Sequence, residues 1–110
     1  MSTTFDERKS AFENKFAHDQ QLQFRVEAKA CKAFGLWIAS QMGMNDADSL
    51  NYANNMVVAN LDEPGLDDVI DMGMADLTKH GQTPSRTTLK SQLDQCVNDA
   101  KNAVMQDVIK

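Results

Sequence analysis

Three phenylalanines near the N-terminus form the first pattern in the sequence that could bind a partner. Phe5, Phe12 and Phe16 are spaced seven and four residues apart, so a helix would place all three on one face. Charged side chains occupy the other sides of that helix: Asp6, Glu7, Arg8, Lys9, Glu13 and Lys15. A helix of about 12 residues is marginal in water on its own. The aromatic face therefore predicts either docking on the rest of the chain or folding against a partner protein.

The remaining reactive residue types favour structural roles. The sequence contains no phosphate-binding glycine loop, no zinc-protease motif and no nucleophile elbow, which predicts a protein that is not an enzyme. His80 precedes Gly81 and suits a helix C-terminus, whereas His18 suits a surface or an interface. Cys31 and Cys96 fall on apolar helical stripes without metal-ligand spacing, so we expect small buried hydrophobic residues in a reducing compartment.

An acidic run is the one feature that suggests a metal ion. It consists of Asp62, Glu63, Asp67, Asp68 and Asp71. A calcium loop needs oxygen ligands at alternating positions, a central glycine and a terminal glutamate. The run has none of this periodicity, so we expect a solvated helix start and no metal site.

Charge and aromatic residues are divided unevenly along the chain. The net charge of −5 argues against nucleic acid as the main partner, because phosphate binding needs a basic face. Residues 1–32 carry a net charge of +1, and six of the seven aromatic side chains lie within residues 1–37. Residues 33–78 carry eight Asp or Glu residues and no Lys or Arg. This division predicts an aromatic N-terminal region attached to an acidic domain.

The chain shows no sign of a membrane span or a secretory signal. No apolar run approaches 18 residues, and the first nine residues are polar and charged. We therefore expect a cytoplasmic protein that does not insert directly into a membrane.

Apolar spacing is helical throughout and predicts an all-α four-helix bundle over residues 19–110. An additional amphipathic segment, disordered or loosely helical when free, occupies residues 1–18. The expected helices run over about 19–42, 46–61, 66–79 and 84–110. Glycines at 43, 65 and 81 mark helix boundaries, Asn45 or Asp46 caps the second of these helices, and Thr83 caps the last, with Pro84 at its first position.

Each expected helix has an apolar stripe that predicts its buried face. In the first it is Phe24, Ala28, Cys31, Gly35, Ile38 and Met42, and in the second it is Leu50, Ala53, Val57 and Leu61. In the third it is Leu66, Val69, Ile70, Met74 and Leu77, and in the last it is Leu89, Leu93, Val97, Ala100, Val104 and Val108. Gly73 lies inside the third helix, where it should cost about 1 kcal/mol relative to alanine.

Several motifs in a fixed order resemble a known family. The sequence reads TFDER at 4–8 and AFENKFAHD at 11–19, then FR at 24–25, GLW at 35–37 and EPG at 63–65. This series is similar to the zeta-subunit ATPase inhibitors of bacterial F-type ATP synthases. The resemblance covers essentially the whole chain, and its last helix matches only in pattern.

The resemblance implies a small helical regulatory protein that binds the catalytic head of the synthase, formed by the α, β and central-stalk γ subunits. Its N-terminal segment would insert into an α/β catalytic interface and block rotation in the hydrolysis direction while permitting synthesis. The positions carried over to this inhibitory segment are Thr4, Phe5, Asp6, Arg8, Lys9, Phe12, Glu13, Lys15 and Phe16. No cofactor is implied.

Two other functions stay open on the sequence. The chain could be a synthase-associated subunit or assembly factor without inhibitory activity, or a helical bundle that binds a nucleotide. An ATP hydrolysis assay on the synthase head separates the first from an inhibitor, and a titration with ATP, ADP and magnesium tests the second.

Overall fold

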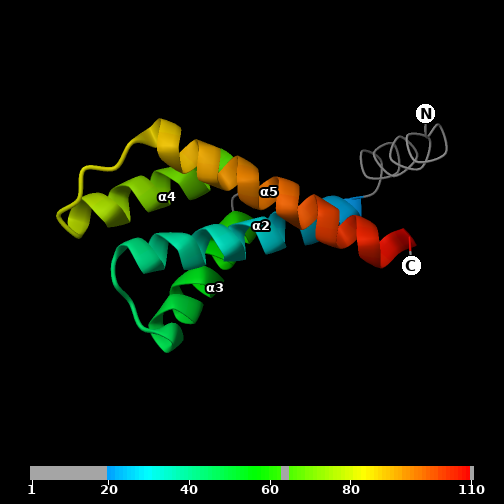
Figure 1. The fold of residues 1–110 in the computed structure, drawn as a ribbon, viewed down its shortest axis with the longest axis horizontal. Coiled ribbons are helices and arrows are strands. Elements are labelled where there is room, and N and C mark those ends of the chain that lie inside the picture. The colour runs from blue at the N-terminus through cyan, green and yellow to red at the C-terminus, as the bar shows by residue number, and fades with distance from the viewer. Residues whose placement is uncertain (1–19, 63–64, 110) are drawn as a thin grey trace.

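The computed structural model describes residues 20–62 and 65–109, and within them it contains four helices and no strand (Figure 1). The helices are α2 (Gln20–Gln41), α3 (Asp46–Asp62), α4 (Leu66–Lys79) and α5 (Arg86–Ile109). The all-α prediction is confirmed, and the expected bounds of the first three of these helices agree with the structure to within one residue.

Local turn chemistry explains why the helices end where they do. Gly43 has φ +71° and Gly81 has φ +89°, the left-handed conformation that glycine adopts without strain after a helix. The N–H of Gln82 donates to the Leu77 carbonyl over 3.0 Å, which satisfies a free carbonyl at the end of α4. At the start of α3, the Asp48 N–H donates to Asn45 Oδ1 over 2.8 Å, so Asn45 is the N-cap.

The start of the last helix differs from the expectation. Helix α5 begins at Arg86, and its cap is Ser85 rather than Thr83. The Thr88 N–H donates to Ser85 Oγ over 3.4 Å, and the Leu89 N–H donates to the Ser85 carbonyl over 3.0 Å. Two hydroxyl residues near Pro84 could serve as caps, and the chain uses the one after the proline.

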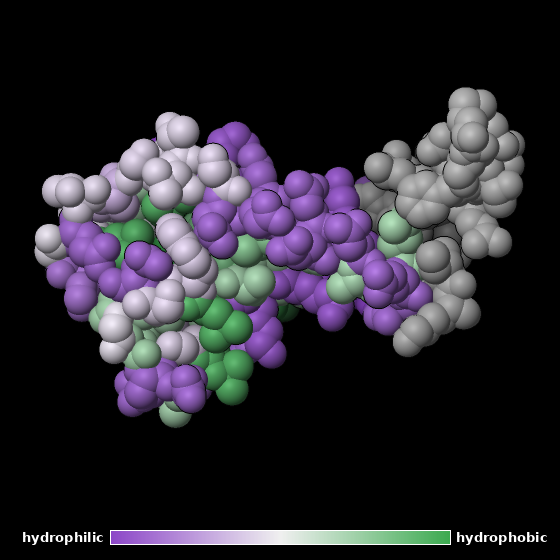
Figure 2. Space-filling model, in the orientation of Figure 1, coloured by the Kyte–Doolittle hydropathy of each residue, from purple (hydrophilic) through white to green (hydrophobic). Residues whose placement is uncertain are grey.

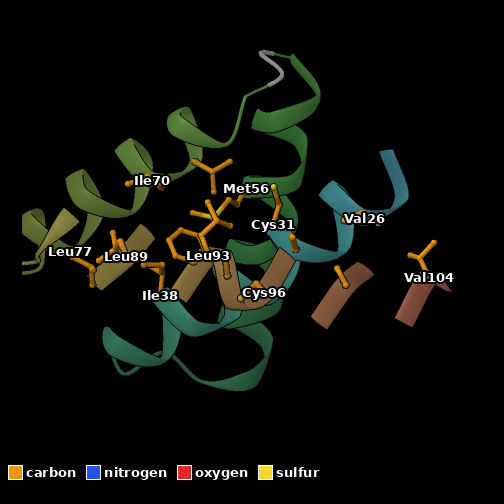
Figure 3. Close-up of a cluster of buried hydrophobic side chains, with 14 of the residues drawn as sticks. Val26, Cys31, Ile38, Met56, Ile70, Leu77, Leu89, Leu93, Cys96 and Val104 are labelled. Carbon is orange, nitrogen blue, oxygen red and sulfur yellow. The ribbon is translucent and has the colours of Figure 1, made fainter. Parts of the chain in front are cut away.

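Side chains from all four helices form one core (Figure 3). Its largest fully buried members are Phe34, Ile38, Met56, Leu89 and Leu93. Trp37 packs against this core, and its ring stacks on Phe34 with centroids 6.0 Å apart and an interplanar angle of 22°. Cys31 and Cys96 are buried in the same core, as predicted.

Two of the expected apolar stripes face differently in the structure. In α2 the buried residues recur every four positions, at Leu22, Val26, Ala30, Phe34 and Ile38. Phe24, which was expected in the core, is 51% exposed. A step of four residues overshoots one helical turn, so the buried face rotates gradually along α2. The smaller Leu22 and Val26 therefore occupy the interior in place of the aromatic ring.

The buried face of α3 also differs from the face that the sequence pattern predicts. Its buried residues are Ala53, Met56 and Asn60, whereas Leu50 and Leu61, expected in the core, are 44% and 48% exposed. The reason is a close approach to α2: a Cβ built on Gly35 would lie 2.7 Å from the Ala53 Cα. Only the small residues on α3 can face such a contact, so its leucines point elsewhere.

Close packing also explains why a glycine occupies position 73 inside α4. A Cβ at this position would lie 3.1 Å from both Ile38 Cδ1 and Leu89 Cδ2. The propensity cost expected for a glycine inside α4 is therefore accompanied by tight packing of α4 against α2 and α5.

The helices differ in length, and this divides the fold into two regions. Helices α2 and α5 have 22 and 24 residues, whereas α3 and α4 have 17 and 14. At about 1.5 Å per residue, the first pair is roughly 10 Å longer. The N-terminal half of α2 and the C-terminal half of α5 extend together beyond the other helices (Figure 1). We call this pair of half-helices the two-helix end and the remainder the four-helix end.

Candidate partner-binding site

The residues predicted to bind a partner, from Thr4 to Phe16, lie outside the described part of the chain, as does His18. The structure instead describes the element that follows them. Helix α2 begins at Gln20, so the predicted segment is joined to the fold at the two-helix end.

A narrow apolar contact between α2 and α5 holds the two-helix end together. Leu22 and Val26 on α2 and Ala100 and Val104 on α5 are all buried. In the close-up, Val26 and Val104 lie apart from the labelled core residues that α3 and α4 help to enclose (Figure 3). Among residues 20–62 and 65–109, each half-helix at this end thus packs mainly against the other.

An ion pair joins the same two helices at the surface. Arg25 Nη2 donates to Asp107 Oδ2 over 3.3 Å, and both side chains are about half exposed. Exposed pairs of this kind contribute between about 0 and 1 kcal/mol. The Arg25–Asp107 pair therefore helps to fix the register of the two helices more than it adds stability.

Phe24 is the residue at this end that the sequence reasoning misplaced. Phe24 is 51% exposed as a residue and lies only four positions after the start of α2. An exposed aromatic ring so close to the predicted segment can add apolar contact area with a partner. The sequence does indicate a functional role for Phe24, because Phe24 and Arg25 belong to the series of motifs that resembles the family.

A shallow hollow of about 310 Å³ lies between α2 and α5 nearer the middle of the molecule. Its lining is mostly apolar, and the residues are Lys29, Lys32, Ala33, Leu36, Cys96, Asp99, Ala100 and Ala103. The two lysines belong to α2 and the single carboxylate to α5. The nucleotide-binding alternative stays a prediction.

The two thiols lack the properties of reactive cysteines. Burial, helped by the nearby Glu27 carboxylate, raises the pKa of Cys31 from 9.0 to about 11. Burial, together with the Asp99 charge, also raises the pKa of Cys96. Both thiols are therefore protonated at neutral pH, whereas nucleophilic cysteines need the thiolate.

The buried polar groups serve packing between helices. Tyr52 Oη on α3 donates to Asp76 Oδ2 on α4 over 2.6 Å. Partial burial and this hydrogen bond raise the pKa of the Tyr52 hydroxyl, so it stays a proton donor. Asn60 accepts a hydrogen bond at Oδ1 from the Gly65 N–H over 3.3 Å, which ties the end of α3 to the start of α4.

The structure bears on two further predictions about ligands and charge. Within residues 20–62 and 65–109, no group of three or more His, Cys, Asp or Glu side chains could hold a metal ion. His80 is exposed at the C-terminal end of α4, the position predicted for it, and its N–H donates to the carbonyls of Asp76 and Leu77 over 3.1 Å.

The described helices thus define a small all-α protein built from four helices, two of which extend beyond the common core. The model of the family "ATPase inhibitor subunit zeta" matches residues 1–103, and the chain belongs to this family. None of the curated proteins and none of the solved structures compared with the chain matches it.

Membership indicates a regulatory ATPase inhibitor subunit and implies association with ATP synthase. None of the four described helices is long and apolar enough to span a lipid bilayer.

Proposed function

We propose that this protein inhibits ATP hydrolysis by the F-type ATP synthase, and that residues 1–18 are the inhibitory segment. In this proposal the segment enters an α/β catalytic interface of the head beside the γ subunit and blocks rotation in the hydrolysis direction. Residues 19–110 form the helical domain that holds it. The observation that carries the proposal is the family match, because it spans residues 1–103 and so includes the segment.

The residue types of the segment support this role. Phe5, Phe12 and Phe16 give a helix one aromatic face, and each such ring can bury about 150–250 Å². Arg8, Lys9 and Lys15 can pair with carboxylates of the enzyme, which fixes the register more than it adds affinity. The segment would fold as it binds, so part of the contact energy is spent on ordering it.

The fold also supports an inhibitory role for the N-terminal segment. The segment joins the molecule at the two-helix end, where α2 and α5 are the only ones of the four described helices. A narrow end can approach a crevice between subunits while the wider four-helix end stays outside. Exposed Phe24 would then lie close to the mouth of the interface and extend the aromatic contact.

An ATP hydrolysis assay on the cognate catalytic head tests the proposal. We expect the full chain to inhibit, and we expect both deletion of residues 1–18 and the double substitution Phe5→Ala with Phe12→Ala to weaken or abolish inhibition. Circular dichroism should show that helices α2 to α5 persist in both variants. Leu36→Ala is a suitable control, because it trims an apolar side chain, 39% exposed, away from the two-helix end. Unchanged inhibition after the deletion would contradict the proposal.

A further inference from the structure

Helix α3 presents an apolar face that the rest of the described fold does not cover. Leu50, Val58 and Leu61 are 44%, 54% and 48% exposed, and they recur at helical spacing on one side of α3. We call these three residues the α3 face. The space-filling view shows strongly hydrophobic surface over α3 (Figure 2). Clustered apolar exposure of this kind marks an interaction surface, whereas single exposed leucines do not.

The packing of α3 explains why this face is open. The opposite side of α3 carries Ala53, Met56 and Asn60 into the core, and α3 packs mainly on α2. The close approach of Gly35 to Ala53 fixes this orientation. Rotating α3 to bury its leucines would separate the backbones of α2 and α3. The contact between these helices therefore keeps the α3 face exposed.

Negative charge borders the α3 face. Asp46 lies in the first turn of α3 and Asp62 is its last residue, and both are exposed. None of the ion pairs found among the described residues uses them. The sequence has no Lys or Arg between residues 33 and 78, so no neighbouring cation on this part of the chain neutralises them.

This charge decides between the candidate occupants of the α3 face. A second copy bound through the same face would bring acidic borders against each other. The N-terminal segment of this chain carries three acidic and three basic residues over 1–18, so it offers no net positive charge. A separate protein surface with an apolar centre and a Lys- or Arg-rich border fits the face best.

We propose that the α3 face is a second docking site for the catalytic head of the synthase, and that it binds an apolar patch with a basic border on that head. This inference rests on the proposed inhibitory function. The inhibitor would then be bivalent: once the N-terminal segment is engaged, the α3 face binds at a high effective concentration and slows release. The central Asn54, which is exposed between the apolar residues, can supply a hydrogen bond within the contact.

The test compares matched leucine substitutions in the full-length protein. Leu50→Gln together with Leu61→Gln removes apolar contact and keeps helix propensity, because Leu and Gln are similar helix formers. We expect the concentration that gives half-maximal inhibition to rise at least about tenfold. Leu36→Gln, an equivalent change on α2, should leave it unchanged. Circular dichroism should be the same for all three proteins.

A charge change provides an independent measurement. Asp62→Lys reverses one border charge at the end of α3 and should weaken inhibition several-fold at low salt. Because salt screens such interactions, the difference from wild type should shrink at high ionic strength. The matched control is Asp94→Lys, which changes an exposed acidic residue on α5. This variant should not show the salt-dependent difference.

The outcomes separate the two proposals. If wild-type protein fails to inhibit, the proposed function itself is wrong. If wild type inhibits and the Leu50/Leu61 double variant inhibits equally well, the α3 face is no docking site for the head and this inference is overturned. It is equally overturned if wild type is a dimer in solution that the double variant converts to monomer, since a second copy would then cover the face.

Discussion

The two-helix end and the four-helix end are built from the same two long helices, yet they are stabilised to different extents. At the four-helix end, Phe34, Ile38 and Met56 are fully buried between neighbours from α2, α3, α4 and α5. At the two-helix end, Val26 and Val104 are buried in a contact formed by α2 and α5. Local stability follows the density of buried apolar contact. The protein thus places its most stable packing away from the end to which its predicted functional segment is attached.

This arrangement suits a regulatory subunit. A segment that must bind between other proteins needs a firm anchor, but its immediate attachment must adapt to the shape of the target. The four-helix end supplies the anchor, and the two-helix end can adjust without unfolding the rest. Substitutions at the two ends should therefore differ in their effect on stability.

The largest expected effect comes from the central ring of the four-helix end. Phe34→Ala should lower the free energy of unfolding by about 3–5 kcal/mol, because the side chain is fully buried. Val26→Ala at the two-helix end removes two methyl groups and should cost only about 1.5 kcal/mol. Urea unfolding of both variants measures the difference. Equal losses would show that the two ends are packed alike.

Substitution at the close approach between α2 and α3 should destabilise the protein almost as much as Phe34→Ala. Gly35→Ala would place its new methyl group against the Ala53 backbone, and we expect a loss of about 1–3 kcal/mol. Gly73→Ala is the matched control. Its new methyl group is crowded at 3.1 Å by the flexible ends of Ile38 and Leu89 and makes an ordinary contact of 3.5 Å with the Phe34 ring, and the gain in helix propensity of about 1 kcal/mol offsets this crowding. Thermal unfolding of the two variants should therefore separate them clearly.

Alkaline pH should destabilise the four-helix end. The pKa of Cys31 is raised from 9.0 to about 11 in the folded state, so above pH 9 the unfolded chain loses this proton first. Its stabilising contribution is complete below pH 9 and is lost as the pH rises through about 11, on the order of 2 kcal/mol in total. Tyr52 acts in the same direction, because its pKa is also raised.

Stability measured by denaturation between pH 8 and 11 checks this prediction. Tyr52→Phe should flatten the fall and cost about 1 kcal/mol at neutral pH, because it also removes the hydrogen bond to Asp76. A stability that stays constant across this range would contradict the burial of both groups.

The smallest effect is expected at the surface of the two-helix end. Arg25→Ala breaks the exposed pair with Asp107 and should change the free energy of unfolding by no more than about 0.5 kcal/mol. Amide hydrogen exchange gives a sharper comparison. In wild type the first half of α2 should exchange faster than its second half, and Arg25→Ala should widen that gap. A loss above 2 kcal/mol would mean that the pair stabilises the whole fold.

Local sequence signals predicted the elements well. The bounds of α4 were expected at 66–79 and are found at Leu66–Lys79, because Pro64 precedes the helix and Gly81 follows it. The turn at Gly43 and the cap at Asn45 were likewise determined by neighbouring residues. Such signals act within a few positions along the chain, so tertiary structure does not overrule them easily.

The orientation of the helices could not be predicted in the same way. In α3 the sequence pattern places Leu50, Ala53 and Leu61 in the core, and the structure buries Ala53 but leaves both leucines exposed. Ala53 faces α2 because the two backbones approach closely at Gly35, and this orientation turns the leucines outward. That choice depends on a partner helix far away in sequence. The exposed α3 face was missed for the same reason, since the pattern places two of its three residues, Leu50 and Leu61, in the interior.

The position of the single tryptophan has a practical consequence for binding studies. Trp37 stacks on Phe34 at the four-helix end, on the second half of α2. Its fluorescence therefore reports the integrity of the core, and a partner that engages only the first turns of α2 should leave the emission spectrum nearly unchanged. Spectroscopic titrations with the synthase head need a dye or a fluorine label near Phe24. Trp37 then serves in the same sample as an internal standard that the fold is intact.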